Sequence, residues 1–164
     1  MTFKYNNVYI NNTETIAGKK EKEGPLGKIF DKTKQDYYFG EKTWEQAEIK
    51  LISENIKELL KKADLTIKDI DLLISGDLLN QIVASNYAAS KVDLPFLGIY
   101  NACASSVEGL IIASNMIEAN QIKNAIITSS SHNNGAEKQY RNPVEYGGPK
   151  KEYTTFTTTG CASC

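Results

Sequence analysis

Short apolar runs alternate with segments of helical periodicity along this sequence, and no other feature constrains the fold as strongly. Short runs rich in Ile, Leu and Val indicate buried strands, whereas apolar residues that recur every three or four positions indicate a helix with one buried face. The order βαβαβαβ predicts an α/β fold with a mostly parallel sheet and helices on both faces. The expected strands are 8–17, 70–75, 95–100 and 124–130, and the expected helices are 43–63, 79–90 and the segment from Cys103 to Ile117.

The expected helices differ in how they should pack. Thr43 and Gln46 have the spacing of a capping box, which predicts a helix start at Thr43. The helix after Cys103 is apolar on several sides, so we expect it to be central and buried. The charged stretch from Lys19 to Gly40 contains Gly-Pro punctuation and is expected to form a long loop.

Composition excludes several classes of protein. The chain has 164 residues, of which 41% are apolar and 24% are charged, as is typical of a globular domain with a core. The formal net charge is -1 without a long basic block, so we expect no nucleic-acid partner. No apolar run is long enough to cross a membrane, and the first residues lack the apolar core of a signal peptide. Three cysteines, an odd number, favour a reducing compartment over a disulfide framework.

Cys103 follows an expected strand directly and precedes an expected helix. The unpaired N–H groups of a helix's first turn favour thiolate over thiol, and they also bind carboxylates and oxyanions. Small residues on both sides leave the sulfur accessible to a ligand. The alternative is a buried cysteine that packs as a small apolar side chain.

The carboxyl ends of parallel strands meet at one edge of a sheet, where ligands bind. The segments that leave strands at that edge are 76–81, 101–105 and 131–134. We therefore expect Cys103 and His132, the one histidine in the sequence, to lie near each other, with Asn80 and Asn101 in the same neighbourhood. For His132, the alternative is a loop residue hydrogen-bonded to a neighbour.

Several segments resemble known proteins. One segment is Asn101-Ala102-Cys103-Ala104-Ser105-Ser106, which resembles the nucleophile segment of the thiolase superfamily. Across nearly the whole chain, the sequence is similar to one branch of that superfamily, the stage V sporulation protein AD family of spore-forming bacteria. The segments that carry this resemblance are 21–27, 40–45, 75–81, 130–133, 136–140, Pro143 and 145–148.

The resemblance implies a thiolase-like α/β fold of which residues 1–164 form the N-terminal half-domain, ending before the last strand and the second half. It implies a sporulation protein that takes part in the uptake of dipicolinic acid (pyridine-2,6-dicarboxylate) into the developing spore by binding it, free or as its calcium chelate. The implied partners are other proteins of the same uptake system. Separately, half of such a fold leaves an open sheet edge, which favours pairing with a second copy. The implied location is the cytoplasm or forespore, peripheral to the inner forespore membrane.

The same resemblance suggests the residues of the site. Asn80, Asn101, Cys103 and His132 are the expected ligand-binding residues. The alternative function is an acyltransferase or condensing enzyme with Cys103 as nucleophile and His132 as base. Turnover by this chain alone is not expected, because the family's further catalytic histidine and asparagine lie in the second half. No cofactor is expected.

Charged residues near the expected site have two interpretations each. Lys138 or Arg141 could neutralise a ligand carboxylate, or could be solvated surface charges. Asp77 would repel a dianion unless calcium intervened, and otherwise it could cap a turn or helix.

The end of the sequence carries two further patterns. Cys161 and Cys164 have the spacing of half a zinc site, but a complete site needs about four ligands, so no metal site is expected. The β-branched run 154–159 suggests a strand that begins there. In the family, residues 160–164 are expected to form a turn of small residues that leads into a strand.

Overall fold

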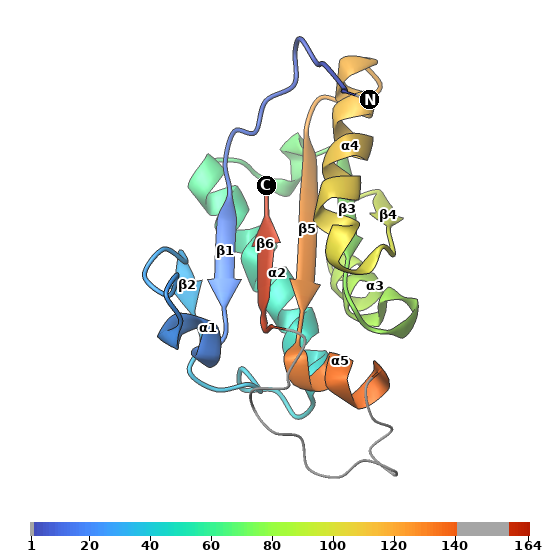
Figure 1. The fold of residues 1–164 in the computed structure, drawn as a ribbon. Coiled ribbons are helices and arrows are strands. Elements are labelled where there is room, and N and C mark those ends of the chain that lie inside the picture. Colours follow the sequence, from blue (N-terminus) through green and yellow to red (C-terminus); the bar gives the residue numbers. More distant parts are fainter. Residues whose placement is uncertain (1, 141–157) are drawn as a thin grey trace.

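Six strands form one mixed sheet, in the order β2-β1-β6-β5-β3-β4, in the computed structural model, which describes residues 2–140 and 158–164 (Figure 1). Three strand pairs are parallel (β1 with β2, β3 with β4, β3 with β5), whereas β6 runs antiparallel to both of its neighbours. The predicted α/β class, with a mostly parallel sheet, is confirmed. The strands are β1 Glu14–Ala17, β2 Lys32–Thr33, β3 Leu72–Gly76, β4 Phe96–Gly98, β5 Ala125–Ser131 and β6 Gly160–Ser163. The α-helices are α1 Lys19–Glu23, α2 Trp44–Ala63, α3 Val83–Ala89, α4 Ser105–Glu118 and α5 Asn133–Tyr140, and the 3-10 turns are η1 Ile67–Asp69, η2 Asn80–Ile82 and η3 Ala102–Ala104.

Helices cover the two faces of the sheet, with α2 behind it and α4 in front in the view of Figure 1. The larger core cluster joins α2 and α3 to one face, where Leu73 and Ile126 project from the strands. The smaller cluster joins α4 to the other face through Ile74 and Ile127. Because neighbouring residues of a strand point to opposite faces and both faces are covered here, β3 and β5 each begin with three consecutive apolar residues, 72–74 and 125–127.

The long helix α2 begins and ends where its sequence predicts. The Thr43 hydroxyl accepts a hydrogen bond from the Gln46 N–H at 3.2 Å, which satisfies one of the free donors of the first turn. At the other end, Asp64 adopts a left-handed conformation, and its N–H bonds the carbonyls of Leu60 and Lys61. The buried stripe of the helix faces the sheet and contains Ala47, Leu51, Ile52, Ile56 and Leu59.

Helix α4 is buried along one stripe only, so the expectation of a central, buried helix is wrong. Its buried residues are Ser105, Gly109 and Ala113, all small and spaced by four. Small residues let the helix axis come close to the sheet, while Val107 and Ile111 on the other side of the helix are exposed. This helix therefore has more apolar side chains than the described part of the chain covers.

The N-terminal region differs from its expected form. The predicted strand 8–17 is shortened to β1, because the neighbouring strand β6 reaches only as far as Glu14. The predicted loop 19–40 contains α1 and β2. It is held against β1 because the Asp31 carboxylate accepts the N–H and the hydroxyl of Thr15, and the Lys34 N–H bonds the Ala17 carbonyl.

The predicted helix 79–90 is divided into η2 and α3. Gln81 and Ile82 have φ values of 58° and 47°, which an α-helix does not tolerate. The side-chain amide of Asn86 bonds the Gln81 carbonyl and holds this turn. Helical periodicity shows only which residues are apolar. It could not reveal the break, because the break lies in the backbone angles of Gln81 and Ile82.

Residues 160–163 form β6, where the sequence suggested a turn. The strand lies between β1 and β5 and pairs with both, Cys161 opposite Ile16 and opposite Ser130. The side chains of β6 are small, and they fit between the side chains of β1 and β5 on its two sides. Of the suggested strand start at 154–159, residues 154–157 lie outside the described residues, and Thr158 and Thr159 are not part of a strand.

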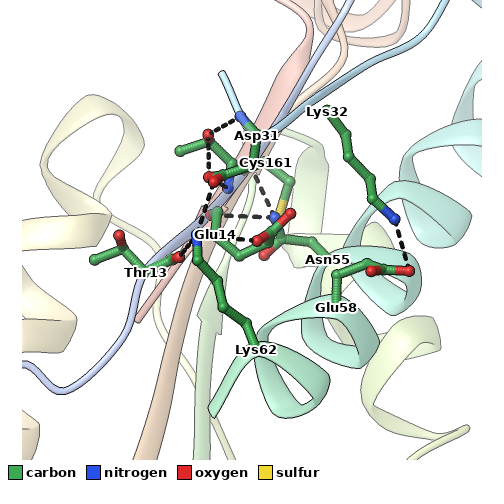
Figure 2. Close-up of polar contacts among 9 residues, drawn as sticks. Thr13, Glu14, Asp31, Lys32, Asn55, Glu58, Lys62 and Cys161 are labelled. Atoms are coloured by element: carbon green, nitrogen blue, oxygen red, sulfur yellow. Dashed lines mark hydrogen bonds and ion pairs between the residues drawn. The ribbon is translucent and has the colours of Figure 1, made fainter. Parts of the chain in front are cut away.

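A group of polar contacts fastens β1 and β6 to α2 (Figure 2). The Asn55 side-chain amide donates to the backbone carbonyls of Glu14 and Cys161, both at 3.2 Å, and so bridges the two strands. The Lys62 ammonium donates to the Thr13 carbonyl at 2.8 Å and pairs with Asp31 at 2.7 Å. This ion pair lowers the pKa of Asp31. The contacts fix the chain that enters β1 relative to the carboxyl end of α2.

Candidate ligand-binding site

Cys103 lies where the sequence predicts it, in the turn η3 between β4 and α4, and its side chain is exposed. The turn is sharp because Ala102 has a φ of 44°, in the left-handed region. The hydroxyl of buried Ser105 accepts the Asn101 N–H at 3.2 Å and braces the turn from below. No side chain caps the start of α4, but the N–H groups of Ala104 and Ser105 already bond the carbonyls of Asn101 and Ala102 in η3 and are not free donors.

The close approach of β3 to this turn requires a glycine. A Cβ atom on Gly76 would lie 2.7 Å from the Ile99 carbonyl oxygen and 3.0 Å from the Cβ of Ser105. Both distances are shorter than a side chain permits. Gly76 therefore lets the end of β3 pass directly beneath the segment that carries Cys103.

A cavity of about 710 Å³ opens beside Cys103 on the face of the sheet that α4 leaves uncovered. Its volume falls within the range of small-molecule sites. Leu78, Phe30 and Tyr100 give it an apolar wall, and Ser129 and Ser131 add hydroxyl groups. Among the described residues that line it, Glu21 carries the one formal charge.

Glu21 is held in a fixed position in this cavity. Its Oε1 atom accepts the Thr159 N–H at 3.1 Å, and its buried Oε2 atom has no hydrogen-bond partner among the described residues. Such an orphaned oxygen usually accepts from a water, a ligand or an ion. Sequence analysis missed this residue, because one glutamate in a run of lysines and glutamates has no distinguishing pattern.

His132 is fully buried and does not line the cavity beside Cys103. Its Nε2 atom lies 2.6 Å from the Tyr37 carbonyl oxygen and must donate to it, while Nδ1 accepts the Gly135 N–H at 3.5 Å. The ring also packs edge-on against Phe39. Burial lowers the pKa of His132, so the neutral ring with a proton on Nε2 is favoured. Both ring nitrogens are thus engaged away from Cys103.

The two asparagines expected at the site are exposed and are not part of the cavity wall. The Asn80 N–H donates to Oε1 of Gln139, on α5, at 2.7 Å. Asn101 takes part through its backbone, as described above. The structure therefore brings Cys103 to the cavity, but not the side chains of Asn80, Asn101 or His132.

The other charged candidates have structural partners. Asp77 accepts the N–H groups of Leu79 and Ser85, so the expectation of a capping role is confirmed; burial raises its pKa. Lys138 pairs with Glu45 at 3.0 Å on the surface. Arg141 lies outside the described residues.

Cys161 and Cys164 do not form half a metal site. Cys161 is buried on the α2 side of the sheet beside Thr128, where burial raises the pKa of its thiol to about 12. Cys164 belongs to the cluster on the α4 side. Residues 2–140 and 158–164 contain no group of three or more side chains arranged to hold a metal ion.

Comparison with known proteins identifies the family. The model of the stage V sporulation protein AD family matches residues 1–164. Stage V sporulation protein AD of Bacillus subtilis (strain 168) is 45% identical over 153 residues, which are 93% of this chain and 45% of that protein. The chain belongs to the stage V sporulation protein AD family. It spans less than half the length of this curated family member.

Solved structures similar to this family member are thiolase-like condensing enzymes, as the sequence resemblance implied. An OleA variant of Xanthomonas campestris has 19% identity and a TM-score of 0.62, covering 97% of this chain and 55% of its own. A 3-oxoacyl-(acyl carrier protein) synthase III of Xanthomonas oryzae pv. oryzae has 18% identity and a TM-score of 0.60, with coverage of 97% and 55%. These likenesses show the fold. In the described part of this family member, every helix is too short or too polar to cross a bilayer.

Proposed function

We propose that this chain takes part in the uptake of dipicolinic acid into the developing spore and binds it in the cavity beside Cys103. Membership of the stage V sporulation protein AD family supports the role in sporulation. The cavity supports a flat aromatic ligand, because Phe30, Tyr100 and Leu78 give it an apolar wall. Ser129 in the cavity wall adds a hydroxyl group that can donate to a carboxylate.

The observation that carries the proposal furthest is the free oxygen of Glu21. A free dicarboxylate would be repelled by this carboxylate, since the described lining of the cavity holds no positive side chain. The calcium chelate of dipicolinic acid brings its own cation, and calcium readily takes carboxylate oxygens as ligands. We therefore propose that the chelate is the bound form, with the negative charge of the Glu21 carboxylate attracting its calcium.

Titration calorimetry at pH 7 tests this proposal, using dipicolinic acid with and without equimolar calcium. The chelate is expected to bind more tightly than the free acid. Glu21→Gln is expected to weaken binding of the chelate about tenfold, as for loss of one contact to a charged group. Glu23→Gln, on the exposed side of the same helix, is the matched control and should leave binding unchanged. Absence of heat with both forms of the ligand would refute the proposal.

The second candidate is acyl transfer through Cys103, which is favoured by the exposed thiol at the start of α4 and by the condensing-enzyme fold. His132 does not supply the base that this reaction needs, because both of its ring nitrogens are engaged elsewhere. Intact mass spectrometry after incubation with acyl-coenzyme A distinguishes the two. A covalent acyl adduct that Cys103→Ala abolishes would favour this candidate.

We further propose that the protein acts at the inner forespore membrane, in the cytoplasm or forespore, together with other proteins of the same uptake system. A second copy is proposed to pair through β4, the edge of the sheet. Leu97 on that strand and Tyr100 just beyond it are exposed, and β4 has a free side. Such an edge readily pairs with another strand.

A further inference from the structure

The Glu21 carboxylate belongs to a position from which a glutamate normally caps its own helix. Gly18 is the N-cap residue of α1, and Glu21 is the third residue of that helix. A glutamate there usually reaches back to accept the N–H of the N-cap residue. Here the Gly18 N–H donates to the Thr159 carbonyl at 2.8 Å instead. Glu21 accepts the Thr159 N–H at 3.1 Å, so both polar groups of the Thr159 backbone are used.

Thr159 is itself held in place. It is fully buried, and its hydroxyl accepts the N–H of Asn133, at the start of α5, at 3.1 Å. The adjacent Thr158 carbonyl accepts the hydroxyl of Ser131, at the end of β5, at 2.6 Å. These contacts join the residues before β6 to β5 and α5. Glu21 therefore bonds to a segment that is held from several sides, and this keeps its carboxylate at the cavity.

Gly18 leaves the space that this arrangement needs. A Cβ atom on Gly18 would lie 2.6 Å from Oε2 of Glu21 and 3.0 Å from the Cβ of Thr159. The backbone of Gly18 is held on both sides, because its N–H bonds Thr159 and its carbonyl accepts the Lys22 N–H at 3.1 Å. The flexible side chain of Glu21 would therefore be the group that shifts. The φ and ψ of Gly18, -77° and 179°, suit any residue, so glycine is needed here for space alone.

We propose that Gly18 and Thr159 are positioning residues that hold the Glu21 carboxylate at the cavity and so set its preference for the calcium chelate over the free acid. This inference rests on the function proposed above. A carboxylate held beside apolar walls attracts a cation more strongly than one that is free in water, because the effective dielectric constant is lower. The same charge repels the free dicarboxylate. The position of one carboxylate therefore acts in opposite directions on the two forms of the ligand.

The variant Gly18→Ala tests this inference, because it displaces the carboxylate without removing its charge. Titration calorimetry measures the affinity for dipicolinic acid with and without equimolar calcium. We expect Gly18→Ala to weaken binding of the chelate about fivefold and to leave the free acid bound at least as tightly as in the parent. In the Glu21→Gln background, the same substitution should have no further effect, because the displaced group is uncharged. Glu21→Asp keeps the charge but is one methylene too short to reach the Thr159 N–H, so it should resemble Gly18→Ala.

Gly24→Ala is the matched control. Gly24 ends the same helix with nearly the same φ and ψ, -76° and 173°, but it does not line the cavity. Both forms of the ligand should bind this variant as they bind the parent. The inference would be overturned if Gly18→Ala left the ratio of the two affinities unchanged, or if it weakened the chelate equally in the Glu21→Gln background. Failure of the parent chain to bind either form would refute the proposed function, and this inference with it.

Discussion

At the scale of single residues, Glu48 is unusual because an acidic side chain rarely lies in a protein core. It lies on the buried stripe of α2 and is fully buried. Ser130 donates to its Oε1 atom at 2.8 Å, while Oε2 has no partner among the described residues. Burial, and then the nearby carboxylates of Asp77 and Glu45, raise the pKa of Glu48 to about 8. The carboxyl group is therefore protonated in the folded protein at neutral pH.

This pKa predicts a specific dependence of stability on pH. In the unfolded chain, Glu48 ionises near its ordinary pKa of 4.5, so between about pH 4.5 and 8 the folded state holds one more proton. The free energy of unfolding should fall as pH rises through this window, by roughly 1 kcal/mol per pH unit from this group. Urea unfolding at pH 5, 6, 7 and 8 measures the slope.

Glu48→Gln should remove this contribution to the slope, because glutamine does not titrate. Glu54→Gln, a half-exposed position of the same helix, is the matched control and should retain the slope of the parent chain. The same slope in Glu48→Gln and in the parent would show that Glu48 ionises normally in the folded state.

Sequence patterns predicted the position of Cys103 but not which side chains lie around it. A strand followed by small residues and a helix suffices to place a residue at a strand end. Whether a side chain there turns toward the cavity or into the core depends on tertiary packing. His132 turned inward because Tyr37 and Phe39, almost a hundred residues away, form its surroundings. By contrast, Glu48 could have been found from its spacing with Ile52 and Leu59 on the apolar stripe of α2.

At the scale of elements, Gly109 sets how closely α4 can lie against the sheet. A Cβ atom there would be 2.6 Å from the Cγ2 methyl of Ile127 and 3.4 Å from the Cδ1 atom of Ile99. Alanine is ordinarily the better helix former by about 1 kcal/mol. Here overpacking should outweigh that gain, so Gly109→Ala is expected to lower the free energy of unfolding by about 1–3 kcal/mol.

Chemical denaturation of Gly109→Ala measures this effect. Ser106→Ala, at an exposed position of the same helix, is the control and should be neutral or slightly stabilising. Stabilisation in both variants would mean that α4 can move away from the sheet at little cost.

Most of the elements were predictable because their signals are local. The cap at Thr43 and the apolar stripe of α2 belong to one stretch of sequence, as do the apolar runs of β3 and β5. The short strands β2 and β6 were not predictable from sequence. Each is a strand because it pairs with β1, and its own residues carry no distinct strand pattern. The exposed side of α4 was also missed, because periodicity shows which residues are apolar but not what covers them.

At the scale of the whole molecule, the free edge at β4 is where we propose that a second copy pairs. Pairing of two β4 strands would bury Leu97, which is 38% exposed. We expect sedimentation equilibrium to show a reversible dimer that Leu97→Lys shifts toward monomer, because a charge on an edge strand opposes pairing. Ile29→Lys, an exposed position between α1 and β2, should leave the equilibrium unchanged. A monomer at all concentrations would exclude this interface.

The position of β6 has a consequence for how the chain acquires its structure. In the strand order, β1 and β2 connect to the other strands only through β6, which lies far from both in the sequence. The N-terminal strand must therefore wait for a partner almost 150 residues later in the chain. Contacts of such long sequence separation slow folding and leave strand edges unpaired in the meantime. Until β6 has been synthesised, β1 packs against α2 with one edge unpaired, and a chaperone's protection is most valuable in that interval.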